Sequence, residues 1–248
     1  MERNSTTEAI VLVNRPYAEL HRRVTLLSPD LGIFEAVVYG GRKGKLGGGL
    51  EPFTSGLFYL YHNRVRNSYS ITDVLVNKDV RTLKSDFERI CIANALAEIV
   101  MKMDGGDYQM LYTLLGDSLE LLDDKQVPSK RIFTLFVWQF IQGMGLVDEF
   151  TCCPVCGKEY HQQQVLLFNS SLHAPCCQEC ADIDVPLGPG ARRYLVVVQH
   201  LPIGTAATVE LSDQAQMRLY RYMVSYVTTL LGQGLKSLSL LTTEEFTQ

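Results

Sequence analysis

Four cysteines in two identical pairs constrain this chain more than any other feature. Cys153 and Cys156 form one C-x2-C pair, and Cys177 and Cys180 form a second pair after twenty intervening residues. Two residues between thiolates let one tight turn present both sulfurs to a single ion, and two such turns complete a tetrahedron around Zn²⁺. Gly157 follows the first pair, where the turn needs a residue of wide conformational freedom. The spacing therefore predicts one structural zinc ion per chain, with no open coordination position.

Other residues near the pairs leave alternative ligand sets open. Cys152 and Cys176 offer ligands at a spacing of three, while His161 and His173 lie between the pairs. We expect the x2 pairs to bind the ion, because both turns then share one geometry. Cys91 lies in an apolar helical run and is expected to be a small buried residue. The clustering is not typical of a disulfide framework, and no signal peptide is apparent, so we expect a reducing, cytoplasmic compartment.

The first part of the chain is typical of a small β-barrel. Its segments are rich in β-branched and aromatic residues, and Pro, Gly, Asn and Asp separate them. Five short strands over such a length favour an OB-fold. The predicted strands are residues 8–13, 21–28, 33–39, 57–62 and 69–76, with a hairpin turn at residues 30–32.

From about residue 80 the apolar residues recur with a helical period. We expect helices near residues 83–103, 108–122, 129–142, 191–200 and 214–231, with Ser129 and Ser212 as N-caps. The zinc segment, at about 150–182, interrupts them. We therefore predict an α+β chain, with an OB-fold domain over residues 1–79 and an α-helical domain over residues 80–248 that carries the zinc finger. Because no apolar stretch is long enough to span a bilayer, we expect no membrane association.

Basic residues are concentrated in the N-terminal part of an acidic chain. The net charge is −4, yet residues 1–80 hold ten Lys and Arg against eight Asp and Glu. A nucleic-acid-binding surface must therefore be local. A glycine-rich loop over residues 40–49 can follow a phosphate backbone closely, and its cations suit the phosphates. The candidate DNA-binding residues are Arg42, Lys43 and Lys45 in this loop, and Arg22, Arg23, Arg64 and Arg66 nearby in the sequence.

Aromatic residues accompany these cations in the predicted barrel. Side chains alternate along a strand, so either Phe58 and Leu60 or else Tyr59 and Tyr61 belong to the barrel core. The outward set, together with the cations, would suit single-stranded nucleic acid, which binds by base stacking and a basic groove. For the glycine-rich loop, the alternative is a solvated connection with no ligand.

Three local patterns occur in order along the chain. They are the glycine-rich loop that closes on Leu-Glu-Pro-Phe at residues 50–53, the Phe-Thr-Leu-Phe helix from Phe133 that ends before Gly145, and the paired C-x2-C turns. Their order and spacing resemble the RecO family of bacterial recombination mediators, over nearly the whole chain.

The resemblance implies binding of single- and double-stranded DNA, and annealing of strands coated with single-strand-binding protein. It implies work with RecR, and with RecF, to load RecA, at the nucleoid in the cytoplasm. It also implies that the C-terminal tail of single-strand-binding protein docks on the helical domain, where Arg131 fits the position of a tail-binding cation. A solvated arginine at a helix start is the alternative for Arg131.

Two other classes of function are alternatives for a chain of this composition. A zinc enzyme needs an open coordination position and a nearby acid–base group, such as the His-x-Glu of nucleobase deaminases. The chain has no His-x-Glu and its five histidines are scattered, so we expect no enzyme. The second alternative is a zinc-ribbon and OB module that binds single-stranded nucleic acid in RNA metabolism or transcription. Composition does not exclude it.

Overall fold

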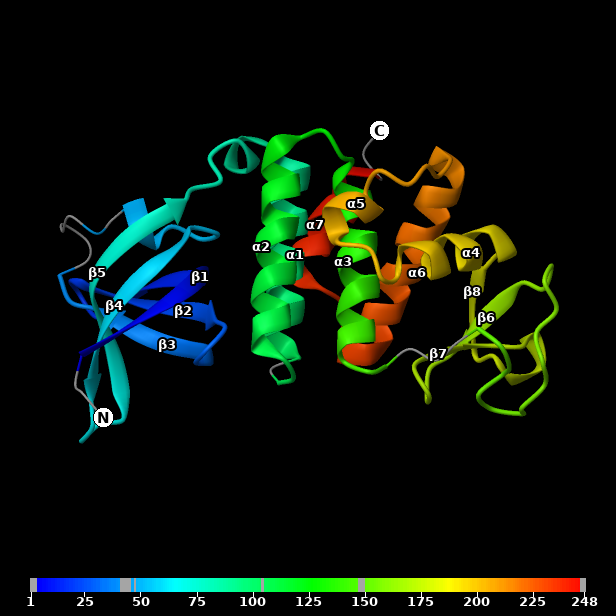
Figure 1. Cartoon of the computed structure of the whole chain (residues 1–248), viewed down its shortest axis with the longest axis horizontal. Coiled ribbons are helices and arrows are strands. Elements are labelled where there is room, and N and C mark those ends of the chain that lie inside the picture. The colour runs from blue at the N-terminus through cyan, green and yellow to red at the C-terminus, as the bar shows by residue number, and fades with distance from the viewer. Residues whose placement is uncertain (1–3, 41–45, 47, 104, 147–149, 246–248) are drawn as a thin grey trace. The chain divides into compact units, whose positions relative to one another are not determined.

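The computed structural model of this chain describes residues 4–40, 46, 48–103, 105–146 and 150–245. The fold is α+β, with an N-terminal five-stranded barrel of OB-like strand order and a cysteine cluster in the C-terminal region, as predicted (Figure 1). Two compact units emerge, Met1–Ser85 with Asp104–Asp123, and Asp86–Met103 with Asp124–Gln248. This grouping gives nearly all of helix α2 (Tyr108–Asp124) to the barrel unit, and differs from a single division near residue 79. The domain boundaries stay a prediction.

The first unit is built on a closed barrel of five strands. They are β1 (Asn4–Tyr17), β2 (His21–Ser28), β3 (Gly32–Val38), β4 (Ser55–Asn63) and β5 (Ser68–Lys78). Their order is β1–β2–β3–β5–β4, and β1 closes the barrel by pairing with both β2 and β4. The β3–β5 pair is parallel and the other pairs are antiparallel.

Strand β1 is buried on both faces near its middle. Ala9 and Val11 belong to the barrel core, whereas Ile10 faces helix α2, where a Cβ on Gly116 would lie 3.7 Å from Ile10 Cδ1. A bulge between Val11 and Val13 adds one residue to β1 against β2. Burial on both faces explains why this segment is a continuous apolar run rather than an alternating one.

The alternation along β4 settles which of its side chains form the core. Phe58 and Leu60 are buried in the barrel, and Tyr59 is 40% exposed on the outer face. The end of the barrel near β5 is covered by the short helix η1 (Gly48–Leu50), which buries Leu50 in the same core.

The predicted turn before β3 depends on Gly32. Its φ is +68°, and a Cβ at this position would lie 2.7 Å from the ring of Tyr108 in α2. Glycine is the residue that suits both the left-handed backbone and this close approach. The short helix η2 (Leu83–Ser85) follows β5, and Leu83 N donates to Asp123 Oδ1 at 2.7 Å.

The second unit packs its helices around α3 (Ser129–Gly143), which is buried nearly all round. A helix that is apolar on every side belongs in a core. Helices α1 and α6 contact α3, and α7 contacts α1. The remaining helices of this unit are α1 (Phe87–Lys102), α4 (Pro189–Val198), α5 (Ile203–Ala206), α6 (Asp213–Leu231) and α7 (Lys236–Glu245). Cys91 is buried in α1, as predicted. No helix in the described parts of the chain is long and apolar enough to cross a membrane.

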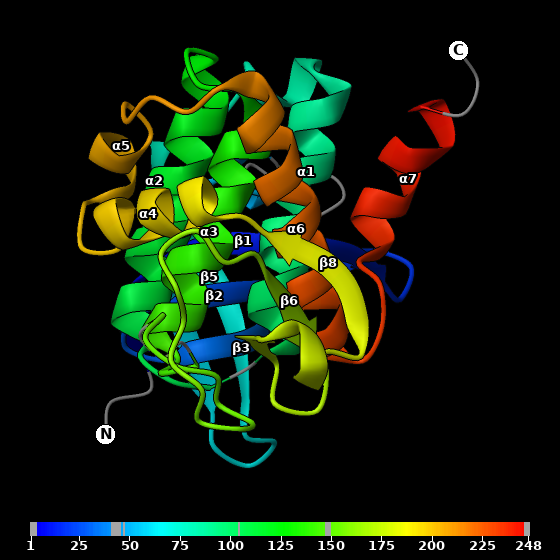
Figure 2. The same ribbon diagram turned by 90° about the vertical axis from the view of Figure 1, so that its right-hand side faces the viewer.

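The cysteine-containing segment forms a small sheet of its own. Strands β6 (Leu166–Asn169), β7 (Ala174–Cys176) and β8 (Ile183–Leu187) pair in the order β7–β6–β8. Figure 2 shows β6 and β8 side by side next to α6, on which β8 packs. Phe168 of β6 meets the rings of Tyr222 and Tyr226 in α6, with centroids 5.9 and 5.1 Å apart. These aromatic contacts attach the segment to the helical core.

One of the two predicted helix caps is confirmed and the other is wrong. Ser212 caps α6, with Oγ accepting a hydrogen bond from Ala215 N at 3.4 Å. At α3 the N-cap is Pro128, whose fixed φ leads into the helix. Ser129 is instead the first helical residue, and its buried hydroxyl donates to the carboxylate of Glu88.

A carboxylate of α1 caps the start of α7. Glu98 accepts hydrogen bonds from the backbone N–H groups of Lys236 and Ser237, both at 3.2 Å, and pairs with Lys102 Nζ at 2.7 Å. Burial raises the pKa of Glu98, but the bonds from Lys102, Ser237 and Lys236 outweigh it and hold the pKa below its usual value. The carboxylate also lies favourably at a helix N-terminus.

We predict that Glu98→Gln lowers the free energy of unfolding by about 1–2 kcal/mol at neutral pH. A depressed folded-state pKa gives stability that is present above the unfolded-state value of about 4.3 and lost as pH falls through the folded value. The difference between wild type and variant should therefore shrink in acid. Urea unfolding at about pH 7 and about pH 3.5 measures it, with Glu210→Gln, at an exposed carboxylate, as the control. An equal loss at both pH values would contradict this role.

Candidate metal centre and nucleic-acid interface

The four cysteines of the C-x2-C pairs come together in one cluster. Their sulfurs all lie within 4.8 Å of one another, and Cys156 Sγ lies 3.7 Å from Cys177 Sγ. A tetrahedral ion with metal–sulfur bonds of about 2.3 Å separates its ligands by about 3.8 Å. The spacing therefore fits one metal ion held by Cys153, Cys156, Cys177 and Cys180.

The two turns of the cluster are built differently. Gly157 has a φ of +73°, and its N–H donates to the Cys153 carbonyl at 2.8 Å, which closes the first turn. The second turn is the short helix η3 (Gln178–Cys180), in which Cys180 N donates to the Cys177 carbonyl at 3.0 Å. This 3₁₀ turn closes the second pair, as the turn at Gly157 closes the first pair.

Hydrogen bonds favour the ionised form of the Cys153 sulfur. Burial raises its pKa, but the backbone N–H groups of Cys177, Cys156 and Val155 donate to the sulfur and lower the pKa to about 6. The pKa of Cys177 is raised by burial, and that of Cys180 is raised first by its hydrogen bond with Cys177. One thiolate thus forms easily, and a cation that offsets mutual repulsion favours the others.

The neighbouring cysteines and histidines lie outside this cluster. Cys152 is exposed and its backbone bridges to Glu159, while Cys176 is buried in β7 with a pKa raised by burial to about 11. Neither His161 nor His173 belongs to the four-sulfur group. The geometry supports the x2 pairs over the alternatives, and the ligand assignment stays a prediction.

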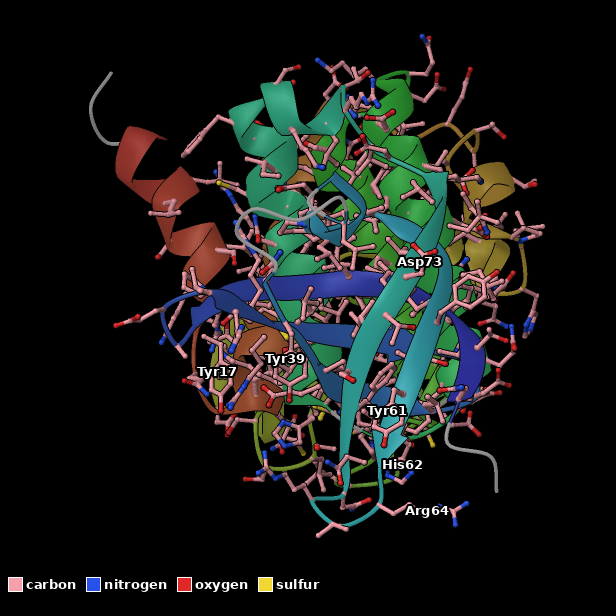
Figure 3. All side chains as sticks on the ribbon, turned by 90° about the vertical axis from the view of Figure 1, so that its left-hand side faces the viewer. Tyr17, Tyr39, Tyr61, His62, Arg64 and Asp73 are labelled. Atoms are coloured by element: carbon pink, nitrogen blue, oxygen red, sulfur yellow. The ribbon has the colours of Figure 1, made fainter. Side chains whose placement is uncertain are left out.

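Aromatic and basic side chains gather on the outer face of the barrel, at one end of β1, β2 and β3. We name Tyr17, His21, Arg23 and Tyr39 the aromatic–cation cluster. Arg23 Cζ lies 4.2 Å from the Tyr17 ring centroid, and the His21 ring meets the Tyr39 ring edge-on at 5.0 Å. Figure 3 shows Tyr17 and Tyr39 near one another. Tyr39 is 65% exposed, so its ring can accept a stacked base, whereas Arg23 already lies over one face of the Tyr17 ring, which is 40% exposed.

Strand register explains why these residues meet. Tyr17 pairs with His21 across the β1–β2 turn, and Arg23 pairs with Val37 in β3. Sequence reasoning missed Tyr17 and His21, because it ended the first strand at residue 13. Residues 18–20 are Ala-Glu-Leu and contain none of the usual turn residues, and Pro16 argues against a strand, so no local signal placed Tyr17 opposite His21.

The structure separates Arg22 from Arg23. Successive side chains leave a strand on opposite faces, and Arg22 Nη1 donates to Asn14 Oδ1 at 3.3 Å. Arg23 pairs with Glu35 at 3.7 Å, with both side chains about half exposed. Such a surface pair contributes little, so Arg23 can exchange Glu35 for a phosphate at small cost.

Arg64 and Arg66 lie exposed in the β4–β5 turn. Asn63 Oδ1 accepts two backbone N–H bonds within the turn, at 3.1 and 3.2 Å. At the base of the turn the rings of His62 and Tyr69 stack with centroids 4.7 Å apart. Figure 3 shows His62 and Arg64 at this end of β4. These two arginines are therefore presented on an ordered turn.

The cations of the glycine-rich loop, Arg42, Lys43 and Lys45, lie outside the described residues. The loop begins at Gly40, whose N–H donates to His21 Nδ1 at 3.2 Å. The loop therefore leaves the barrel at the aromatic–cation cluster.

Arg131 uses its guanidinium within the second unit. Nε donates to Gln216 Oε1 at 2.7 Å, and Nη1 and Nη2 donate to the carbonyls of Ala207 and Leu211 at 3.2 and 3.4 Å. These bonds tie the first turn of α3 to the segment that enters α6. They support a structural role, and the assignment of Arg131 to partner binding stays a prediction.

Family models match both parts of the chain. The one described as recombination protein O N terminal matches residues 1–78, and the one described as recombination protein O C terminal matches residues 84–239. The chain belongs to the RecO family. The resemblance seen in the sequence is thereby confirmed.

Curated relatives agree with the RecO family models over most of the chain. A protein of Alkaliphilus metalliredigens is 27% identical over 182 residues, 72% of each chain. One of Thermodesulfovibrio yellowstonii is 24% identical over 92% of this chain and 93% of its own length. One of Desulfatibacillum aliphaticivorans is 23% identical over 95% of both chains. All three relatives carry the name DNA repair protein RecO.

We predict that Cys153→Ser abolishes stoichiometric metal binding and lowers the melting temperature by about 5 °C or more, because metal binding contributes directly to folding. Elemental analysis and thermal unfolding of the purified chain measure the two effects. Cys152→Ser makes the same change at the exposed neighbouring residue and should leave both unchanged. Loss of metal from the Cys152 variant, but not from the Cys153 variant, would show that Cys152 is the ligand in place of Cys153.

Proposed function

We propose that this chain is a DNA-binding recombination mediator that contacts DNA through its OB barrel. The observation that carries the proposal is the aromatic–cation cluster, exposed on the barrel at the point where the basic loop begins. Single strands bind by base stacking on aromatic side chains beside a basic groove, and the face of strands 2 and 3 is a usual OB platform. The relatives' name, DNA repair protein RecO, supports DNA as the nucleic acid.

The proposed binding mode does not depend on sequence. Bases stack on Tyr39, while Arg23 binds phosphate. Phosphate contacts position a strand without reading its bases. The other candidate phosphate-binding cations are Arg42, Lys43 and Lys45 of the loop, Arg64 and Arg66 of the β4–β5 turn, and Arg22.

We propose annealing as the reaction that this surface serves. Annealing requires a protein to neutralise two backbones and to leave the bases free to pair, so it needs no covalent chemistry and no catalytic residue. The chain would bind single- and double-stranded DNA, and would anneal complementary strands that are coated with single-strand-binding protein. With RecR, and with RecF, it would help to load RecA at the nucleoid. The small basic surface of an acidic chain supports work within such a complex.

We propose Zn²⁺ as the ion of the four-cysteine cluster, with a structural role. Zinc accepts four thiolates in a tetrahedron and has no redox chemistry. The sheet of β6, β7 and β8 is too small to bury a large core, so an ion that fastens its two turns would contribute most of the order there.

The barrel interface is tested by Tyr39→Ala in the full chain. We expect the affinity for a single-stranded oligonucleotide to fall by about 1–3 kcal/mol, the usual contribution of one base–aromatic stack. Tyr59→Ala removes another exposed tyrosine of the same barrel, outside the cluster, and should change affinity little. Fluorescence anisotropy measures both. Equal losses of DNA affinity in the two variants would show that the aromatic–cation cluster is not the stacking site.

The glycine-rich loop is tested by replacing Arg42, Lys43 and Lys45 with Ala. Each phosphate contact contributes about 0.7 to the log–log salt slope on single strands, so the slope should shrink by about 2 if all three engage. Affinity should fall by a similar factor for unrelated DNA sequences, and annealing should fall with it.

Replacement of Arg218, Arg221 and Lys236, which are exposed in the other unit, removes the same charge and is the control. If the loop variant keeps the wild-type salt slope and annealing rate, the glycine-rich loop is a solvated connection that does not bind DNA. Tighter binding of RNA than of DNA by the wild type would favour the alternative role in RNA metabolism.

A further inference from the structure

The turn between β4 and β5 projects beyond the barrel. The pairing of β1 with β4 reaches Tyr61, and the pairing of β3 with β5 begins at Tyr69. Past these two residues the described strands of the hairpin pair only with each other. Figure 3 shows Arg64 at the outer end of this hairpin. We name residues 64–67 the β4–β5 tip.

An apolar side chain leads the β4–β5 tip. Val65 is 96% exposed, more than any other large apolar residue in the described parts of the chain. Single exposed apolar residues are common on protein surfaces, so exposure alone assigns no role to Val65. Its neighbours in the chain are Arg64 and Arg66, which are both exposed. The tip therefore presents one apolar group between two cations.

Hydrogen bonds hold the β4–β5 tip in one conformation. The N–H groups of Val65 and Arg66 donate to Asn63 Oδ1 at 3.1 and 3.2 Å. Asn67 has a φ of +45°, a left-handed conformation that asparagine tolerates better than most residues, and its Oδ1 lies 3.1 Å from His62 Nε2. Because these bonds are made without a ligand, binding does not have to order the tip, which lowers the entropic cost of association.

The chain around the β4–β5 tip is free of acidic residues. Residues 52–72 contain no Asp or Glu, although the whole chain has 27 of them. Among the residues that the structure describes, no carboxylate pairs with Arg64 or Arg66. An unpaired guanidinium is a strong donor to phosphate, so charge complementarity favours nucleic acid. A protein interface needs about 800 Å² on each partner, far more than one exposed valine supplies.

The chemistry of the β4–β5 tip favours duplex DNA over a single strand. Valine has no aromatic face on which an unpaired base could stack. Paired strands lie about 4.8 Å apart and the minor groove of B-DNA is about 6 Å wide, so a hairpin tip can enter the groove end-on. Proteins that enter this groove frequently insert an apolar side chain between base pairs and kink the duplex. Val65 is the residue of this tip that could do so.

We propose that the β4–β5 tip is a wedge for duplex DNA. Arg64 and Arg66 bind phosphates at the two edges of the minor groove, and Val65 enters the groove and partly unstacks one base step. This activity differs from annealing, because it distorts a duplex that has already formed. It rests on the proposed function only in that DNA is the ligand, and it uses residues outside the aromatic–cation cluster.

The test uses the full chain and a duplex with 2-aminopurine at a TA step, a flexible step whose unstacking raises the fluorescence of this base. The wild type should raise the fluorescence, and Val65→Ser should abolish the rise. Val197→Ser makes the same change at a valine that is 57% exposed in α4, and should keep the full rise. Because both side chains are exposed, neither substitution should alter folding, which thermal unfolding checks.

The two arginines are tested by replacing both with Ala in one variant. Each duplex phosphate contact contributes about 0.9 to the log–log salt slope, so the slope on duplex DNA should shrink by about 2. Replacement of Arg218 and Arg221, which are exposed in α6, removes the same charge and should leave the slope unchanged. Netropsin, a small molecule that fills the minor groove at A·T base pairs, should abolish the fluorescence rise.

The outcomes separate the wedge from the proposed single-strand site. A rise that survives in Val65→Ser or in the presence of netropsin overturns the wedge, and so does the absence of a rise when the wild type binds the duplex. Each of these results leaves the barrel interface standing. Tyr39→Ala should weaken single-strand binding and keep the rise on duplex DNA. Unchanged single-strand affinity in Tyr39→Ala overturns the barrel interface alone, and failure to bind either form of DNA overturns both.

Discussion

The barrel depends on one strand that pairs with two partners. The first half of β1 pairs with β4 and its second half with β2, and a bulge between Val11 and Val13 marks the change. Closure leaves no free edge for another strand, and the bulge lets the strand bend around the barrel. The same register ends with Tyr17 opposite His21, so the pairing that closes the barrel also assembles the aromatic–cation cluster.

Local signals in the sequence predicted the parts whose causes are local. The bounds of β2, the cap at Ser212 and the approach of the four sulfurs follow from short patterns. The remaining features depend on distant partners. The polar end of β1 is a strand only because β2 returns beside it, and α2 joins the barrel unit through contacts such as that of Gly116 with Ile10. Arg192 donates to three backbone carbonyls at residues 161–164, and because every residue has a carbonyl, no side-chain pattern predicted these contacts.

The cysteine-containing segment is fastened in two different ways. A metal ion would join its two turns internally, whereas three contacts attach it to the helices: Phe168 on Tyr222 and Tyr226, Phe150 on Trp138, and Arg192 on the carbonyls at residues 161–164. Two of these contacts, those of Phe150 and Arg192, also line a pocket beside α4. The segment is therefore more than a separate finger, because the side chains that attach it to the helices also shape a neighbouring surface.

The barrel unit is discontinuous along the chain, since α1 belongs to the other unit and α2 returns to the barrel. During synthesis, β1 to β5 leave the ribosome well before the residues of α2 that face Ile10 and Gly32. Until α2 is synthesised, the apolar face of the nascent barrel around Ile10 stays exposed to solvent. The contacts that finally bury this face join residues that are about a hundred positions apart in the sequence. Such exposure favours capture by chaperones or aggregation over rapid closure, so the slowest folding step of this unit should be the docking of α2.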